Sequence, residues 1–388
     1  MKRRNNKQDI VLILVATFFY MACPMMTTPL IPGFAESLGG SGAIMGIIGG
    51  LMNVTAMICR PVLGNLADRK SKYKMSSLGA ALTIIACISY ALASNNVVLL
   101  AARICHGVGY ASLSICMATW LAELLPRGKV GFGMGLYGMV NALSMAIMPA
   151  VGIQLYERIG YHAAFALAIG FSLLNGLLIQ LISDKGEPVA QKASQPRHFA
   201  LVDGNVVPIM LIILLFSMPY FATQSFLVTY VSAKHLSVSA SLFFPIYAVM
   251  ILVLRLGLKD YFDRLPFRTF LFVCAASATV SLVAMSLLNG YVTMVIGAIF
   301  MAGGYGIMFS VCQSTAILLG GPGKDALANS TFFIGTDLGM ALGPVIGGLL
   351  YGHSDIGMFY PVLLLTVPLS LAIGFASRKT LAKAQENA

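Results

Sequence analysis

The chain has 388 residues, of which 58% are hydrophobic and only 10% are charged, and its formal net charge is +11. Soluble domains carry about a quarter charged residues, so this chain lacks the polar side chains needed to cover a folded surface in water. The composition therefore excludes a soluble globular protein and predicts a membrane protein.

Apolar runs long enough to cross a bilayer follow one another along the whole chain. The first begins at Ile10, directly after the basic segment MKRRNNK. Because no cleavage site of small residues follows it, we interpret this run as a retained transmembrane helix rather than a signal peptide. The runs predict twelve helices, over residues 10–31, 43–66, 75–94, 97–122, 131–155, 161–183, 206–231, 241–262, 268–288, 291–318, 326–352 and 357–377.

One long polar connection, residues 183–204, divides these runs into two sets of six. We therefore expect an all-α polytopic membrane protein with three parts. They are an N-terminal six-helix bundle over 1–183, a cytoplasmic linker over 184–204 and a C-terminal six-helix bundle over 205–388.

The basic residues test this helix count. With both termini in the cytoplasm, 20 of the 25 Lys and Arg fall on the cytoplasmic side, two on the opposite side and three within spans. Cytoplasmic connections are enriched in Lys and Arg, and a miscounted span would have scrambled this asymmetry. The pattern predicts a multi-pass protein of the cell (cytoplasmic) membrane with both termini inside. It also explains the net charge without a nucleic-acid partner.

All seven cysteines lie within the apolar runs, and none forms a CxxC pair. This pattern suggests neither a disulfide framework nor a zinc site. We expect no metal and no cofactor.

The two halves repeat at a constant offset of 195 residues. The matched pairs fall at equivalent places in the predicted helices: Pro24–Pro219, Arg60–Arg255, Asp68–Asp263, Arg69–Arg264, Lys129–Lys324, Pro149–Pro344, Gly152–Gly347 and Tyr156–Tyr351. Two similarly oriented six-helix halves are typical of secondary transporters, in which the substrate site lies between the halves near the midplane of the membrane.

Three segments carry a resemblance to a known family. RPVLGNLADRKSKYK (60–74) resembles the loop motif of the major facilitator superfamily, and RICHGVG (103–109) resembles its fourth-helix motif. GMALGPVIGG (339–348) has the complete glycine–proline form that this superfamily's drug:proton antiporters carry in the fifth helix. In this chain that form lies in the eleventh predicted helix, and the fifth has the degraded copy SMAIMPAVGI (144–153). The resemblance implies the superfamily's twelve-helix fold and transport by alternating access.

In the loop motif, the matching positions are Gly64, Asp68, Arg69 and Lys74. The resemblance implies that Asp68 makes an interhelical contact that braces the closed cytoplasmic side, supported by Arg69. The duplicate pair, Asp263 and Arg264, favours such a latch over two solvated loop residues. For Arg60 and Arg255, we expect side chains that extend to the membrane interface.

Small residues recur every four positions in the eleventh predicted helix. Gly335, Gly339, Gly343 and Gly347 allow a second helix backbone to approach closely, and Pro344 favours a kink. Such a ridge suits either a gating movement or close packing alone.

The fourth predicted helix carries a polar stripe. Arg103, His106, Tyr110, Ser114 and Met117 share one face at helical spacing. A guanidinium inside a membrane helix should face a cavity or another helix rather than lipid. His106 could titrate near neutral pH, or it could be a packed histidine that hydrogen-bonds between helices.

By resemblance, the first, seventh and tenth helices line a central cavity. Their candidate lining residues are Thr17, Tyr20, Pro24 and Thr28, then Ser217, Tyr220 and Gln224, then Tyr305, Phe309 and Gln313. This aromatic and weakly polar lining suits a bulky amphipathic small molecule better than a sugar.

Asp337 lies about 16 Å inside an apolar core about 30 Å thick. Facing lipid would cost at least about 2.5 kcal/mol, so this carboxyl group should face protein or a wet cavity. It could carry the coupled proton, pair with an arginine such as Arg103, contact a cationic substrate, or make a static hydrogen bond while permanently protonated.

The leading hypothesis is proton-coupled efflux of amphipathic small molecules by a monomer, with Asp337, His106 and Arg103 as proton-coupling candidates. An alternative is an organic anion or metabolite carrier in which Arg103 and His106 hold a carboxylate or phosphate. An intramembrane enzyme or receptor is the least supported class, because we find no nucleophile–base constellation and no H-E-x-x-H spacing.

Overall fold

The computed structural model describes residues 6–125, 130–187, 202–258, 261, 265–320, 325–353 and 356–386. Within these residues, eleven helices are long and apolar enough to cross a membrane, and Ala240–Arg255 forms a shorter apolar helix. The prediction of twelve membrane helices is confirmed. The structure also shows that helix packing divides the chain into two units, Met1–Gly40 with Leu51–Ser194 and Ser41–Gly50 with Gln195–Ala388.

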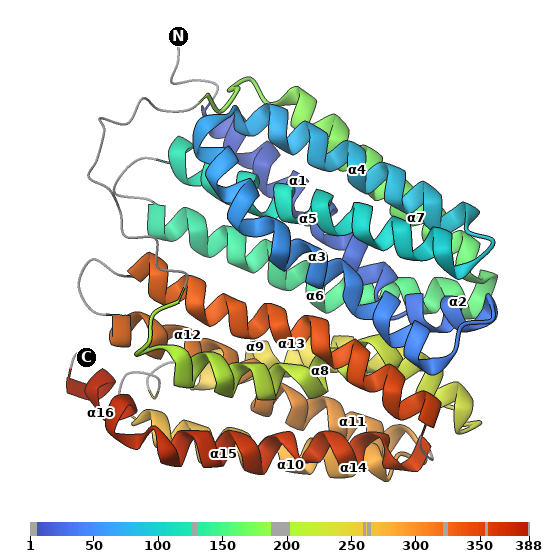
Figure 1. The fold of residues 1–388 in the computed structure, drawn as a ribbon, viewed down its shortest axis with the longest axis vertical. Helices are drawn as coiled ribbons and strands as arrows, with labels where there is room; N and C mark the ends of the chain where they lie inside the picture. Colours follow the sequence, from blue (N-terminus) through green and yellow to red (C-terminus); the bar gives the residue numbers. More distant parts are fainter. Residues whose placement is uncertain are drawn as a thin grey trace. The chain divides into compact units, whose positions relative to one another are not determined.

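Figure 1 shows the helices up to residue 181, and side-chain caps mark the start of two of them. At the start of α4, the Ser71 hydroxyl accepts a hydrogen bond from the Lys74 N–H, and at the start of α5 Asn95 accepts from two backbone N–H groups. Such caps satisfy amide groups that have no partner inside the helix. The helices are α1 (Asn6–Thr27), α2 (Ile31–Ser37), α3 (Gly42–Arg69), α4 (Lys72–Leu92), α5 (Asn96–Leu124), α6 (Val130–Ile159) and α7 (Tyr161–Leu181).

The remaining helices include several interrupted ones (Figure 1). They are α8 (Val207–Ala233), η2 (Ala240–Leu242), α9 (Phe243–Gly257), α10 (Phe267–Ser286), α11 (Tyr291–Met301), η3 (Ala302–Gly306), α12 (Ile307–Gly320), α13 (Asp325–His353), η4 (Ile356–Met358), α14 (Phe359–Leu364), α15 (Thr366–Ala376) and α16 (Arg378–Glu386). Segment η3 is a single π-helical turn between α11 and α12.

Some predicted boundaries were wrong. The first predicted span, 10–31, stops at Thr27, and after a turn the chain forms the short helix α2, with Pro32 in its first turn. The twelfth, 357–377, is divided at Leu365 into α14 and α15, and the basic helix α16 that follows was not anticipated. Hydropathy locates a membrane span well, but it does not reveal a turn that is formed by apolar residues.

Equivalent helices of the two halves have equivalent neighbours. Helix α1 packs against α6 and α7, as α8 packs against α13 and α15; α4 packs against α5 and α7, as α10 packs against α11 and α15. Each pair of partners is related by the 195-residue offset. The two six-helix pseudo-repeats expected from the sequence are confirmed.

The glycine ridge of α13 packs against α8, inside the second unit. A Cβ atom on Gly343 would lie 2.8 Å from the Met218 carbonyl oxygen and 2.9 Å from the Ala222 backbone nitrogen. One on Gly347 would lie 2.9 Å from the Phe226 ring, and Cβ atoms at Gly335 and Gly339 would collide with α8 as well. The ridge therefore brings two backbones of the same unit into contact, as small residues do in membrane bundles.

We expect Gly343→Ala to destabilise the protein by about 1–3 kcal/mol, because the two nearest atoms that the new methyl group meets belong to the backbone and cannot rotate away. The measurement is the thermal unfolding midpoint of the purified protein in detergent. Gly138→Ala on α6 is the matched control, because a Cβ atom there meets nothing within 4 Å. An unchanged midpoint for Gly343→Ala would contradict a close α8–α13 contact.

Candidate functional site

The polar stripe of α5 lies inside the first unit. Arg103 is completely buried, and its Nη1 lies 3.6 Å from the Met52 sulfur atom. His106 is also buried, with Nδ1 2.9 Å from the Tyr90 hydroxyl oxygen. Tyr110 is buried on the same face. Because a guanidinium keeps its charge even when buried, this stripe places a fixed positive charge within the first bundle.

The hydrogen bond to Tyr90 gives His106 a defined orientation. The two rings also contact each other, with centroids 5.8 Å apart. A histidine held in this way matches the packed alternative considered from the sequence.

A tyrosine cluster occupies the first unit near α5. The Tyr20 and Tyr137 hydroxyl oxygens are 2.8 Å apart, and the Tyr20 and Tyr110 rings lie 6.2 Å apart. The Arg60 guanidinium is within electrostatic range of the hydroxyl groups of Tyr20 and Tyr137, and its Nε is buried. The half-buried Arg60 thus has phenol groups within electrostatic range, and its expected extension to the membrane interface stays a prediction.

A larger aromatic cluster occupies the second unit. Tyr220 stacks on Tyr305 with centroids 4.6 Å apart and planes at 21°, and it contacts Tyr247 at 4.9 Å. Phe309 continues the cluster, 6.1 Å from Tyr305 and 5.1 Å from Phe332.

Arg255 occupies the place in the second unit that Arg60 has in the first. Its guanidinium is within electrostatic range of Tyr247 and Tyr305, and its Nε is buried. Its expected extension to the interface also stays a prediction. Each unit thus combines an arginine at an equivalent position with a group of tyrosines, of which Tyr110 and Tyr305 are also equivalent.

The π turn η3 positions Tyr305. A Cβ atom on Gly306 would collide with the Ile251 side chain and lie 3.2 Å from the Tyr247 hydroxyl oxygen. One on Gly304 would lie 3.0 Å from the Ala278 Cβ atom. The sequence AGGYG therefore lets the widened turn fit among its neighbours and directs one large ring to Tyr220. Turns of this kind are frequent at functional sites.

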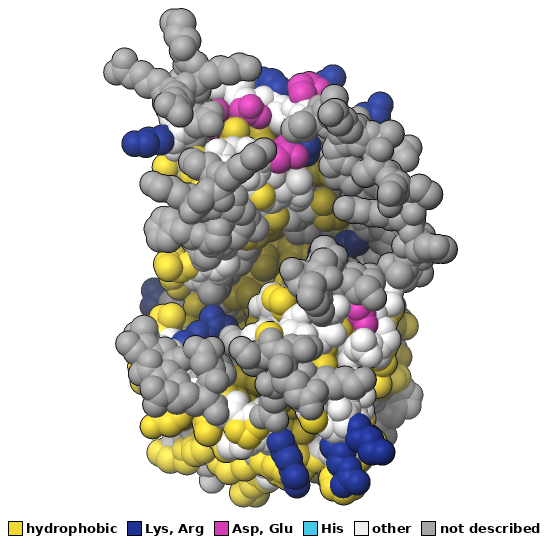
Figure 2. All heavy atoms as spheres, turned by 90° about the vertical axis from the view of Figure 1, so that its left-hand side faces the viewer, with side chains coloured by type: hydrophobic (Ala, Val, Ile, Leu, Met, Phe, Trp, Pro, Cys, Tyr) yellow, Lys and Arg dark blue, Asp and Glu magenta, His cyan; other side chains and the backbone are white. Residues whose placement is uncertain are grey.

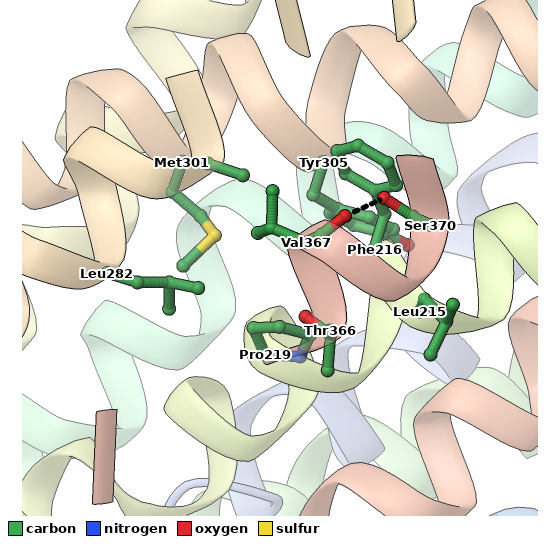
Figure 3. A pocket seen from close by; sticks show the side chains of 10 residues that line it. Leu215, Phe216, Pro219, Leu282, Met301, Tyr305, Thr366, Val367 and Ser370 are labelled. Atoms are coloured by element: carbon green, nitrogen blue, oxygen red, sulfur yellow. Dashed lines mark hydrogen bonds between the residues drawn. The ribbon is translucent and has the colours of Figure 1, made fainter. Parts of the chain in front are cut away.

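A small cavity lies beside Tyr305 within the second unit (Figure 3). Its volume is about 10 Å³, and Pro219, Met301 and Thr366 are among the residues that line it. The Ser370 hydroxyl at its edge donates a 2.7 Å hydrogen bond to the Val367 carbonyl oxygen. This volume holds about one water molecule, so the cavity is too small for a drug-like ligand.

Asp337 is buried on α13, with 8% of its surface exposed. Its carboxyl group is within electrostatic range of the Tyr305 hydroxyl group. Gly335 and Gly339, on either side in the sequence, pack against α8. The structure therefore brings an acid near the aromatic cluster and away from lipid, as the cost of burying it predicts.

The other candidate residues have varied surroundings. The Thr17 hydroxyl is buried and donates to the Ile13 carbonyl oxygen of its own helix, at 2.8 Å. Thr28 and Gln224 are buried, and Gln313 is half-buried. The Thr17 hydroxyl is thus engaged by its own helix.

The residues of the predicted cytoplasmic latch lie largely outside the described part of the chain. The side chains of Asp68 and Arg69, and residues Asp263 and Arg264, lie outside the described part of the chain. Gly64 is described, and a Cβ atom there would meet nothing within 4 Å.

Three aromatic residues were missed from the sequence: Tyr137, Tyr247 and Phe332. The repeat offered a signal, because the offset pairs Tyr137 with Phe332, as it pairs Tyr110 with Tyr305. Aromatic residues retained at both copies of a position mark the two clusters.

A polar network that was also missed joins the ends of four helices in the first unit. Asp9 is buried, and its two carboxylate oxygens accept hydrogen bonds from the Ser183 and Asp184 N–H groups at 2.9 and 3.0 Å. Asp184 in turn accepts one from the Trp120 indole N–H at 2.9 Å. Lys72, also buried, pairs with Glu123 at 2.8 Å. We call Asp9, Lys72, Trp120 and Asp184 the polar clasp.

Gly186 completes this network. Its N–H donates to Asp184 at 2.6 Å, and its carbonyl oxygen accepts from the Lys72 N–H at 2.9 Å. Its φ of +52° is strained for residues with a side chain, and a Cβ atom would lie 2.8 Å from the Lys72 Cβ atom. Figure 2 shows the face on which these helix ends lie, where Lys and Arg side chains (blue) gather beside Asp and Glu (magenta).

Repeated halves of apolar helices, with charged side chains held inside them, are the architecture of a secondary transporter. The family model described as the Major Facilitator Superfamily matches residues 13–319. The chain belongs to this superfamily and is a multi-pass membrane transporter.

Full-length relatives and a solved structure agree with this assignment. Multidrug resistance protein 2 of Bacillus subtilis (strain 168) is 20% identical over 409 residues, with 96% of each chain covered. Quinolone resistance protein NorA of Staphylococcus aureus (strain MRSA252) is 22% identical over 383 residues, with 95% of each covered. The crystal structure of a mutant of the nucleoside transporter NupG has the same fold, with a TM-score of 0.80 and 15% identity over 96% of this chain and 99% of that one.

Proposed function

We propose that this protein exports amphipathic, drug-like small molecules in exchange for protons, by alternating access. The observation that carries the proposal is Asp337, a buried carboxyl group within electrostatic range of Tyr305 and its aromatic neighbours. A carboxyl group in such surroundings can exchange a proton for a cationic aromatic ligand. The names of the relatives, resistance proteins for multiple drugs and for quinolones, support the same substrate class.

Tyr220, Tyr305 and Phe309 would supply flat apolar surface to the ligand, and Asp337 would carry the coupled proton. Arg103 would provide a fixed positive charge in the other unit, with His106 as the second proton-coupling candidate. The charge distribution supports both termini in the cytoplasm, in a cytoplasmic membrane. We expect the monomer to be sufficient for transport.

The test uses everted membrane vesicles with a respiration-driven, acid-inside pH gradient. Cationic, neutral and anionic amphipathic compounds are added in turn, and a pH-sensitive fluorophore reports proton release. We expect cationic compounds to collapse part of the gradient only in vesicles that contain the protein. Silence across the whole panel would overturn the proposal. A response to anions alone, lost in Arg103→Lys, would support the anion carrier instead.

We expect Tyr305→Leu to weaken the apparent affinity for an aromatic cation by about tenfold, whereas Tyr305→Phe retains it, because an aromatic contact contributes about 0.5–1.5 kcal/mol. The KM for efflux is the measurement. Tyr230→Leu is the matched control, since Tyr230 is equally buried in α8 and contacts Phe359 and Tyr360 instead. Equal effects of both leucine variants would indicate a general packing defect.

A further inference from the structure

A groove runs between α4 and α7, inside the first unit. It has a volume of about 630 Å³, which is in the range of ligand pockets, and it is lined by Ser77, Ala80, Ala81, Ile84, Gly170, Leu173, Leu174, Gly176, Leu177 and Gln180. Leu173 and Leu177 are 52% and 56% exposed, so the groove opens outward on apolar side chains. In a membrane-spanning bundle, such an opening faces the hydrocarbon of the bilayer.

Small residues create the groove. A Cβ atom on Gly170 would meet nothing within 4 Å, and one on Gly176 would meet the Ile84 Cδ1 atom at 3.5 Å and the Ala80 Cβ atom at 3.9 Å. These glycines therefore leave space rather than permit a close helix contact. Larger side chains at the same positions would fill the groove without colliding with a backbone.

The groove has one polar end. The Gln180 side-chain amide donates to the Ser77 hydroxyl at 3.1 Å, and the Tyr73 hydroxyl donates to the Gln180 carbonyl oxygen. From Ser77 to Ile84 the α4 helix rises about 10 Å, which is less than half of a hydrocarbon core about 30 Å thick. The groove thus has the length of a segment within a single leaflet.

Two cationic side chains lie at this polar end. The Lys185 ammonium lies 3.8 Å from the centroid of the Tyr73 ring and donates to the Ile182 carbonyl oxygen. Lys74 is exposed and lies three residues before Ser77, on the same face of α4. An apolar trough of one-leaflet length with two ammonium groups at its mouth is complementary to a lipid with an anionic headgroup.

We propose that the groove between α4 and α7 binds one molecule of an anionic phospholipid, with an acyl chain along the groove and the phosphate against Lys74 and Lys185. The site is distinct from the substrate site, since it uses none of the residues assigned to the substrate or to the coupled proton. Its apolar wall, Leu173, Leu174 and Leu177, provides the acyl contact, and its small residues provide the depth.

The experiment is native mass spectrometry of the full chain, purified in detergent micelles that contain equal amounts of phosphatidylglycerol and phosphatidylcholine. We expect the wild type to retain one phosphatidylglycerol in preference to phosphatidylcholine. Gly176→Leu and Gly170→Leu should each lower this occupancy about tenfold. Gly138→Leu, the same change at an exposed glycine of α6 with nothing within 4 Å of its Cβ position, should leave the occupancy unchanged.

The double variant Lys74→Gln/Lys185→Gln separates the headgroup from the acyl chain. We expect it to bind both lipids equally, whereas Lys379→Gln, which removes an exposed lysine of α16, should keep the preference. Equal retention of the two lipids by the wild type would overturn the proposal. So would unchanged phosphatidylglycerol binding in both glycine variants, provided that they elute as monodisperse protein.

Discussion

Everted vesicles that contain the Asp337→Asn variant are expected to show no substrate-driven proton movement, although the protein inserts and folds. Asparagine has the same shape as a protonated aspartic acid and both hydrogen-bonding functions, but it cannot release a proton. A proton carrier would therefore be inactivated, with coupled efflux falling to background. Because Asp337 is buried within range of Tyr305, a neutral amide at this position should be tolerated structurally.

The same substitution separates the alternatives for Asp337. If its role were a static hydrogen bond from a permanently protonated acid, the amide would replace it and efflux would persist. His106→Gln is the companion variant, because His106 is the second proton-coupling candidate and its Nδ1 bond to Tyr90 can be made by an amide as well. Wild-type proton movement in Asp337→Asn and none in His106→Gln would move the coupling role to α5. Substrate counterflow without a gradient checks that each variant still binds and exchanges substrate.

Replacement of Asp9 by alanine is expected to lower the free energy of unfolding by about 3–6 kcal/mol. Hydrogen bonds to a charged group contribute about 1.5–3 kcal/mol each, and Asp9 accepts two from backbone N–H groups at the end of α7. Asp9→Asn keeps one acceptor oxygen, so its loss should be about half as large. Glu187→Ala, which removes an exposed acid only three residues beyond Asp184, should have no measurable effect.

Trp120 provides the measurement. It is the only tryptophan in the chain, it is fully buried, and its indole N–H donates to Asp184. Thermal unfolding in detergent can therefore be followed by Trp120 fluorescence, and the emission of folded Asp9→Ala should already be shifted to the red. An Asp9→Ala protein with wild-type emission and stability would show that the polar clasp contributes little.

The features that were predicted correctly from the sequence depend either on residues close together in the chain or on the exact repeat between its halves. Hydropathy locates membrane spans because each helix must be apolar over its own length to lie in lipid. Arg103 and Asp337 were expected to be buried because a charged side chain in lipid is costly in free energy. The 195-residue offset supplied the relation between the halves. None of these inferences required the position of a distant residue.

The parts that were missed depend on distant partners. Asp9 lies 174 residues from Ser183, and each alone resembles an ordinary polar residue at a membrane boundary. The tyrosine neighbours of Arg60 lie on α1 and α6, and Tyr305 near Arg255 lies in η3, so none of these contacts could be predicted from the sequence around each arginine. The π turn was hidden as well, since AGGYG continues an apolar helical pattern without interruption.

That π turn also distinguishes the two halves of the repeat. Helix α5 is continuous over Asn96–Leu124, whereas its duplicate contains a turn wider than an α-helical one, although the two segments align residue for residue. The wider turn changes the rotation of all side chains after Gly306. Relative to their counterparts in α5, these side chains are rotated about the helix axis by about one residue, or about 100°. Phe309 and Ser114 occupy equivalent positions in the repeat but project in different directions around their helix axes. The two segments therefore have the same length but differ in the rotation of their side chains about the helix axis, so exchanging them would not restore either site.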